Sequence, residues 1–146
     1  MKIFIDCEYN DFKGELISLA LVSEDGKQFY EWLGCDNPSS WVAENVIPRI
    51  GPIKPIRIEH FQFLLQQYLN QFVQCHIIAD WPEDIAHFCN ALIIGPGQRL
   101  DTPSLTLEIV RLDSCSENPH NALADAIALR FTYLEKIMSH RYSYKN

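Results

Sequence analysis

The sequence lacks several features that would assign the protein to other structural classes. No apolar run approaches the roughly 20 residues that a membrane-spanning helix needs. The start has no signal-peptide layout, because only Ile3-Phe4-Ile5 separates Lys2 from Asp6. Five cysteines are present, an odd number without a C-x-x-C pair, so neither a disulfide framework nor a cysteine-rich zinc site is expected. These absences favour a cytoplasmic protein with reduced thiols and no membrane partner.

Positive charge is also scarce. The chain has 12 Lys and Arg residues against 19 Asp and Glu residues, which gives a net charge of −7. Proteins that follow long nucleic acids usually present a basic face. A nucleic-acid partner would therefore need a short footprint, or bound metal ions would have to neutralise part of the negative charge. Charge composition alone favours a partner other than nucleic acid.

The remaining composition is that of an ordinary globular protein. The chain has 146 residues, of which 47% are hydrophobic and 21% are charged. This length is sufficient for one domain with a sizeable core. Because no repeat, low-complexity tract or linker interrupts the sequence, we expect a single domain over residues 1–146.

Hydrophobic patterning predicts an α/β protein with a mixed central sheet flanked by helices. An Asp25-Gly26 turn between two apolar runs predicts an early hairpin. The expected strands cover residues 2–6, 15–23, 27–33, 75–79 and 105–112. The expected helices cover residues 41–45, 58–73, 82–94 and 121–139. The alternation of strands and helices in the second half indicates parallel strands covered by helices.

Two carboxylates stand at the end of the first expected strand. Asp6 and Glu8 are two residues apart, so in a strand their side chains lie on the same face. Two like charges held this close repel each other unless a cation lies between them, and carboxylate oxygens are the preferred ligands of Mg²⁺ and Mn²⁺. The alternative is a strand that simply runs into an acidic turn.

Acidic residues also follow the fourth expected strand, where the next helix begins. Asp80, Pro82 and Glu83 have the spacing of a capped helix start, with Asp80 at the cap and Glu83 closing a capping box. Asp84, one turn further on, would then be free to face the end of the first strand. Both Asp80 and Asp84 are also explained by the general preference of acids for helix N-termini.

The start of the last expected helix carries a histidine and another acid. His120 precedes the helix, and Asp125 follows five residues later, inside it. The small residues Ala122, Ala124 and Ala126 let this helix lie close against the sheet, which brings Asp125 near the strand ends. A single histidine before a helix is more commonly a capping or surface residue.

Together these motifs resemble the DEDDh 3′–5′ exonucleases, which include oligoribonuclease, ribonuclease T and a bacterial proofreading subunit. The resemblance rests on Asp6-x-Glu8, an aspartate after the fourth strand, and His120-x-Ala122-x-x-Asp125-Ala126. It spans essentially the whole chain and implies a ribonuclease H-like fold. The short length and the stretch from Ser40 to Pro48 are most similar to compact bacterial and phage 3′–5′ exoribonucleases.

The resemblance implies a role for each matching residue. Asp6, Glu8, Asp84 and Asp125 would bind two divalent ions, Mg²⁺ or Mn²⁺, with Asp80 as the alternative fourth ligand. His120 would be the general base that accepts a proton from the attacking water. Glu8 would also lie near the terminal 3′-hydroxyl. The expected reaction is hydrolysis of single-stranded or short RNA 3′ ends to nucleoside 5′-monophosphates.

Several alternatives stay open at this level. The chain has Tyr9 and Asn10 where many family members carry a threonine, so the terminal-nucleotide pocket is expected to differ. Tyr9 and Trp81 are candidates to stack on bases, with ordinary packing as the alternative. DNA ends are an alternative substrate, since no residue in the sequence indicates the contact with a 2′-hydroxyl that would distinguish RNA from DNA. A non-catalytic binding module on the same fold is a third hypothesis, and a homodimer is possible through Trp32 and Trp41.

Overall fold

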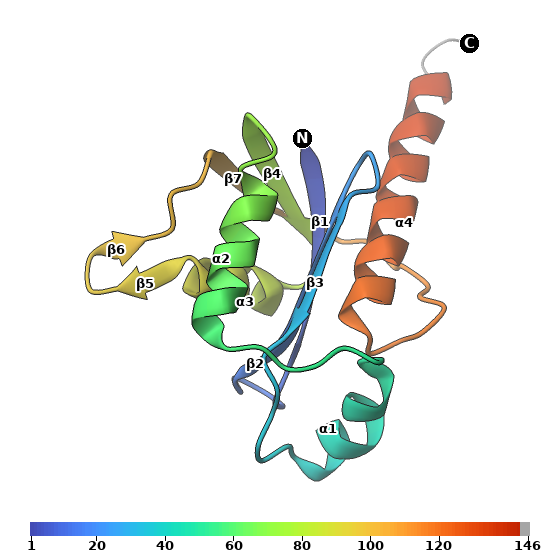
Figure 1. The fold of residues 1–146 in the computed structure, drawn as a ribbon. Helices are drawn as coiled ribbons and strands as arrows, with labels where there is room; N and C mark the ends of the chain where they lie inside the picture. The colour runs from blue at the N-terminus through green and yellow to red at the C-terminus, as the bar shows by residue number, and fades with distance from the viewer. Residues whose placement is uncertain (144–146) are drawn as a thin grey trace.

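The computed structural model describes residues 1–143, with side chains as far as residue 139. Its strands are β1 (Lys2–Tyr9), β2 (Leu16–Ser23), β3 (Gln28–Trp32), β4 (Gln74–Ala79), β5 (Ile93–Gly95), β6 (Gln98–Arg99) and β7 (Ser104–Ile109). Its helices are α1 (Ser40–Asn45), the short 3₁₀ helix η1 (Ile47–Arg49), α2 (Ile58–Leu69), α3 (Pro82–Ala91) and α4 (Ala122–Ser143). Figure 1 shows these elements arranged around one central sheet.

The central sheet has five strands in the order β3-β2-β1-β4-β7. The first three strands of the chain pair antiparallel, and β1, β4 and β7 run parallel to one another. The expected hairpin at Asp25-Gly26 joins β2 to β3, and Gly26 has a φ of +92° that suits glycine. The predicted α/β class and the mixed sheet flanked by helices are therefore confirmed.

Helices cover both faces of this sheet (Figure 1). On one face, α2 and α3 pack against the main core, which includes Ile3, Ile5 and Ile77 from the strands. On the other face, the first turns of α4 lie against β2, where Ala122 and Ala126 are fully buried beside Ala20. The small side chains thus permit the close approach of α4 that the sequence predicted.

The central strand β1 is longer than expected. It extends to Tyr9, so Asp6 and Glu8 lie within the strand and not beyond its end. The pairing of β1 with β2 changes register between Glu8 and Tyr9, which is a β-bulge directly after the second acid. Such bulges bend a strand and redirect its side chains, and here the bulge stands beside the cluster of acids.

Two predicted helices end early. Helix α2 ends at Leu69, four residues before the predicted boundary, and α3 ends at Ala91. The apolar pair Ile93 and Ile94, which we expected to continue α3, instead enters a small hairpin of β5 and β6 with Gly97 at its turn. Short apolar runs do not distinguish a helix end from a short strand, so the sequence did not predict this hairpin.

The predicted capping box at the start of α3 is wrong. The residue at the N-cap position is Trp81, and no side chain caps the helix there. Glu83 reaches instead to the β1–β2 turn, where its carboxylate accepts a hydrogen bond from the backbone N–H of Lys13 at 2.9 Å. Asp80 is therefore not the N-cap of α3, contrary to the prediction from the sequence.

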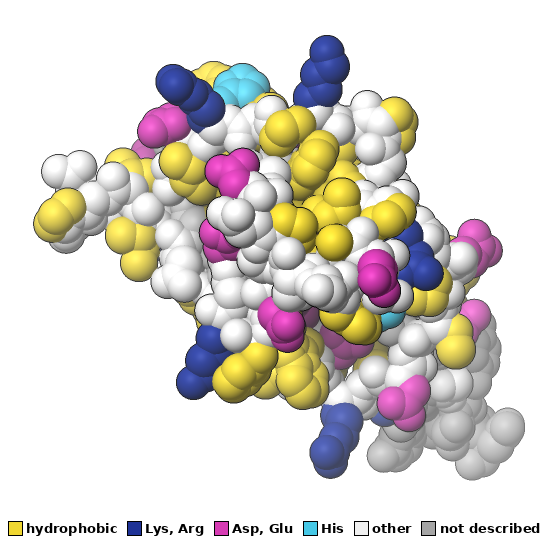
Figure 2. Space-filling model, turned by 90° about the horizontal axis from the view of Figure 1, so that it is seen from below, with side chains coloured by type: hydrophobic (Ala, Val, Ile, Leu, Met, Phe, Trp, Pro, Cys, Tyr) yellow, Lys and Arg dark blue, Asp and Glu magenta, His cyan; other side chains and the backbone are white. Residues whose placement is uncertain are grey.

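The surface agrees with the acidic composition. On the face in Figure 2, Lys and Arg side chains are scattered and do not gather into one patch. No helix within residues 1–143 combines the length and apolar character needed to cross a bilayer. Of the two tryptophans suggested as a dimer surface, Trp41 is 51% exposed. Trp32 offers less surface, because it is partly buried against the cluster around Val42.

Candidate metal centre and active site

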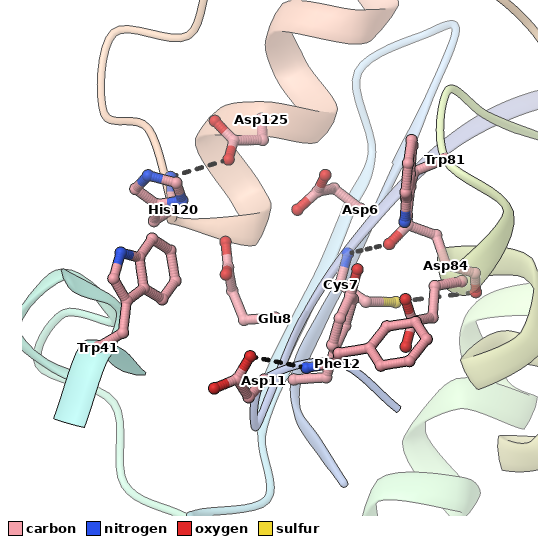
Figure 3. A pocket seen from close by; sticks show the side chains of 12 residues that line it. Asp6, Cys7, Glu8, Asp11, Phe12, Trp41, Trp81, Asp84, His120 and Asp125 are labelled. Atoms are coloured by element: carbon pink, nitrogen blue, oxygen red, sulfur yellow. Dashed lines mark hydrogen bonds between the residues drawn. The ribbon is translucent and has the colours of Figure 1, made fainter. Parts of the chain in front are cut away.

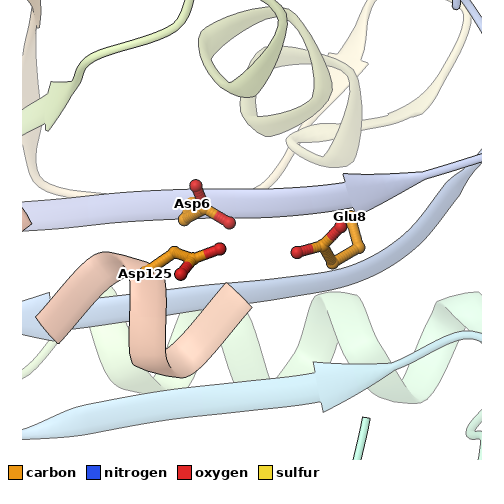
Figure 4. A group of neighbouring side chains, drawn as sticks. All are labelled: Asp6, Glu8 and Asp125. Carbon is orange, nitrogen blue, oxygen red and sulfur yellow. The ribbon is translucent and has the colours of Figure 1, made fainter. Parts of the chain in front are cut away.

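Three acidic side chains from two elements meet on one face of the sheet. Asp6 and Glu8 project from β1 toward α4, which contributes Asp125 from its first turn (Figure 4). One carboxylate oxygen from each residue lies within 4.8 Å of the other two. The two-residue spacing in β1 therefore brings both acids to one point, as the sequence predicted.

A second group of acids shares Asp6 with the first. Asp80, at the end of β4, and Asp84, in the first turn of α3, also place carboxylate oxygens within 4.8 Å of one another and of Asp6. Asp6 is thus the one residue common to both groups. Both candidates for the fourth ligand reach the site, so the geometry does not separate Asp84 from Asp80.

Asp84 is held against the strand that carries the other acids. Its Oδ1 accepts a hydrogen bond from the backbone N–H of Cys7 at 3.2 Å, so α3 is joined to β1 between Asp6 and Glu8. The side chain is only 2% exposed, and its Oδ2 has no hydrogen-bond partner. Burial, followed by the charge of Asp80, raises the pKa of Asp84 to about 8.

The negatively charged forms of Asp6 and Glu8 are also destabilised when no cation is bound. Burial is the main cause of a pKa of Asp6 well above its usual range, and Asp84 and Glu8 add repulsion. Burial and Asp125 raise the pKa of Glu8 to about 8, although the positive charge of Arg49 acts in the opposite direction. The site therefore favours anything that brings positive charge between these carboxylates.

His120 stands at the rim of this site, directly before α4. Its backbone N–H donates a hydrogen bond to Oδ2 of Asp125 at 3.0 Å, and its φ is +65° (Figure 3). The imidazole ring contacts Trp41 edge-on, with ring centroids 5.0 Å apart. The predicted pair of His120 and Asp125 is thus joined through the backbone, and the ring of His120 borders the same cavity as the acids.

Asn121 fixes the start of α4 and was not predicted as a functional residue. Its Oδ1 accepts a hydrogen bond from the backbone N–H of Ala124 at 2.9 Å, as an N-cap does. Its Nδ2 donates to the carbonyl of Arg49 at 2.7 Å and to the hydroxyl of Tyr30 at 3.2 Å. This side chain therefore ties the helix that carries Asp125 to β3 and η1.

The acids open into a cavity of about 420 Å³ (Figure 3). Its aromatic wall includes Phe12, which is 77% exposed, and Trp81, which is 58% exposed. The full lining is Asp6, Cys7, Glu8, Tyr9, Asp11, Phe12, Trp41, Trp81, Glu83, Asp84, His120 and Asp125. Phe12 was not singled out from the sequence, since its role depends on the turn after β1.

Phe12 and Trp81 also border a second cavity. This neighbouring space has a volume of about 510 Å³ and is lined on its far side by Lys13, His87 and Asn90. Tyr9, which lines the first cavity, contacts the ring of His87, which lines the second, with ring centroids 4.9 Å apart and planes inclined at 31°. Of the two predicted stacking residues, Trp81 has the more accessible ring, because it is 58% exposed whereas Tyr9 is only partly exposed.

The donor set fits divalent metal ions. The two groups consist of carboxylates alone, which suits hard cations such as Mg²⁺ and Mn²⁺. Oδ2 of Asp84 and Oδ1 of Asp125 are buried atoms without hydrogen-bond partners. Unsatisfied buried oxygens are costly, and coordination of a cation would satisfy them.

Neither a protein-family model nor a curated protein matches this sequence.

Proposed function

We propose that this protein is a metal-dependent 3′–5′ exoribonuclease of the DEDDh type, with a ribonuclease H-like fold. It would shorten single-stranded or short RNA from the 3′ end and release nucleoside 5′-monophosphates. The observation that carries the proposal is a pair of acidic clusters, each of three residues, that have Asp6 in common. The cavity that most of these acids line is also bordered by His120. The strand order β3-β2-β1-β4-β7, with its antiparallel start and parallel continuation, also supports it.

Two ions would be bound by groups that share Asp6. Glu8 and Asp125 would complete one group, and Asp84, with Asp80 as the alternative, would complete the other. Bound divalent ions would supply Lewis-acid activation of water and of the phosphate, and would neutralise the charge of the acids. The buried, unpartnered oxygens of Asp84 and Asp125 support this assignment, because coordination of an ion would give them partners.

His120 would act as the general base. Its ring borders the cavity next to Asp125, so its free ring nitrogen would accept a proton from the water that attacks the terminal phosphate. The edge-on contact with Trp41 limits where this ring can lie. Glu8, which is largely buried at the same point, would lie near the terminal 3′-hydroxyl by analogy with the family.

The shape and charge of the site favour short, flexible ends. Stacking on an aromatic ring requires an unpaired base, and the exposed ring of Trp81 borders the cavity. With a net charge of −7, the chain offers little attraction to a long phosphate backbone. Single-stranded RNA ends therefore fit the site better than long duplexes.

The test is an assay with 5′-labelled single-stranded oligonucleotides of identical sequence in RNA and DNA, with Mg²⁺, with Mn²⁺ and with a chelator. Metal-dependent shortening from the 3′ end, with release of 5′-monophosphates, is expected for RNA. Asp6→Asn and Asp125→Asn should abolish it, whereas Asp101→Asn, at an exposed position outside the cavity, should not. RNA that stays intact with both metals overturns the proposal, and tight binding without turnover would indicate a binding module. Equal cleavage of DNA would overturn only the RNA preference.

A further inference from the structure

Strand β7 forms an open edge of the central sheet. All six of its residues pair with β4 on one side, from Ser104 opposite Gln74 to Ile109 opposite Ala79. Within residues 1–143, no backbone group of β7 has a hydrogen-bond partner on the other side. The opposite edge differs, because the backbone N–H of Ile56 donates to the carbonyl of Trp32 in β3 at 2.8 Å.

The usual protections of an exposed edge are missing from β7. Edge strands are normally guarded by proline, by lysine or other charged side chains, or by a bulge. β7 contains neither proline nor lysine, has a regular register, and carries a single charged residue. Its one charged residue, Glu108, is bound to His76 of β4 at 2.8 Å. Leu107 and Ile109 are 41% and 53% exposed on the same face of the strand. An apolar edge of this kind can pair with a further strand.

We propose that β7 pairs antiparallel with β7 of a second copy of this chain, with Leu107 at the two-fold axis. In this register Leu107 lies opposite Leu107 of the partner copy, and Leu105 lies opposite Ile109 in both halves. All apolar side chains of the strand are then paired on one face. On the other face Glu108 lies opposite Thr106, so the two glutamates avoid each other.

Neighbouring symmetric registers are worse. Centring the pair on Glu108 places two like charges directly opposite each other, which is destabilising. Centring it on Thr106 pairs Leu105 with Leu107 but moves Ile109 opposite Pro103, which cannot donate to a strand ladder. Among these symmetric registers the strand sequence therefore favours the one centred on Leu107, in which β7 is complementary to a second copy of itself.

The interface is separate from the proposed catalytic site. None of the residues that line the cavity of the acids belongs to β7. The dimer would continue one sheet through two five-stranded halves and leave both cavities open. The inference therefore does not depend on the proposed function, and its tests do not require activity.

The sharpest test is disulfide crosslinking at the axis. Directly opposite residues of an antiparallel pair have Cβ atoms about 4.5–5.5 Å apart, close enough for a disulfide after small adjustments. Leu107→Cys, in a background with the exposed Cys115 changed to serine, should give a covalent dimer on mild oxidation. Val73→Cys in the same background is the control, since Val73 is 95% exposed and lies outside β7. Failure of Leu107→Cys to crosslink beyond the control would overturn the proposal.

Sedimentation or light scattering of the full chain gives a second test. The wild-type protein should be a concentration-dependent dimer. Leu107→Lys should make it monomeric, because two ammonium groups would face each other at the axis. Thr106→Lys should preserve the dimer, because the new charge would lie opposite Glu108 of the partner copy. A wild-type monomer, or a dimer that persists in a folded Leu107→Lys variant, would overturn the proposed interface.

Discussion

The backbone N–H of Cys7 donates a hydrogen bond to the carboxylate of Asp84 at 3.2 Å. This bond crosses from the middle of the Asp6-Cys7-Glu8 segment to the first turn of α3. It explains how one helix is aligned with a strand far from it in the sequence. It also means that Asp84 is both a positioning contact and a candidate ligand. Asp80 differs, because its carboxylate accepts a hydrogen bond from the hydroxyl of Ser114 at 3.5 Å.

The first prediction separates Asp84 from Asp80. Asp84→Asn should abolish metal-dependent cleavage of RNA, because it removes a buried carboxylate that has one free oxygen. The asparagine Oδ1 can still accept the bond from Cys7, so the fold should be kept. Asp80→Asn should retain part of the activity. Cleavage rates and metal titrations of both variants provide the measurement, and the reverse order of losses would identify Asp80 as the fourth ligand.

The second prediction concerns the stability of the metal-free protein. The pKa of Glu8 rises from its usual value near 4.5 to about 8 on folding. Between these pH values the folded state holds more protons than the unfolded state, so the free energy of unfolding should fall as pH rises from about 4.5 to about 8. Glu8→Gln should flatten this decline and stabilise the metal-free protein at pH 8.

Denaturant unfolding in chelator across this pH range measures the effect. Glu44→Gln is the matched control, since Glu44 is exposed in α1 and lies outside the cavity of the acids. Added Mg²⁺ or Mn²⁺ should stabilise the wild type at pH 8, because ligands that bind the folded state raise its stability. A Glu8→Gln variant with the pH slope of the wild type would contradict the assignment.

The third prediction tests the proposed base. His120→Asn should lower kcat by about 10²–10⁴-fold, the usual contribution of a general base. Asparagine is chosen because it tolerates the positive φ at this position better than most residues. His60→Asn, at an exposed position in α2, should leave kcat unchanged. Single-turnover rates with saturating RNA give the comparison, and near-normal rates for His120→Asn would exclude the role.

The fourth prediction concerns the anchor of α4. Asn121→Ala removes a helix cap and two donated hydrogen bonds, and it should reduce the free energy of unfolding by about 1–3 kcal/mol. Asn121→Asp keeps an acceptor for Ala124 but loses the amide donor. It should therefore keep more stability than Asn121→Ala, while both variants weaken metal affinity through misplacement of Asp125. Urea unfolding and metal titration distinguish the two contributions.

The fifth prediction concerns substrate stacking. Trp81→Ala should weaken binding of single-stranded RNA by about 1–3 kcal/mol per stacked base. Phe63→Ala is the control, because this ring is similarly exposed, at 52%, but lies on α2 outside both cavities. Dissociation constants from a catalytically inactive Asp6→Asn background provide the measurement. Equal affinities of the two variants would assign Trp81 to ordinary surface packing.

Much of this architecture follows from local patterns in the sequence. The Asp25-Gly26 hairpin and the slim start of α4 each depend on neighbouring residues, and each was predicted correctly. The two-residue spacing also placed Asp6 and Glu8 on one face, because strand geometry alone determines it.

Other features depend on contacts between distant segments and could not be predicted. Glu83 turns away from its expected capping role because the backbone of Lys13, in the β1–β2 turn, offers it a partner. The role of Asn121 depends on Tyr30 and Arg49, which are remote in sequence. The β5–β6 hairpin turns at Gly97, and the short apolar run before it, Ile93 and Ile94, fits a helix end equally well.

The order in which the acids occur along the chain has a consequence during protein synthesis. Asp6 and Glu8 leave the ribosome before Asp84, and Asp125 is the last of these four residues to leave it. A growing chain therefore lacks one wall of the proposed catalytic centre until α4 can fold against the sheet. The proposed nuclease would therefore lack a complete metal site until α4 has left the ribosome.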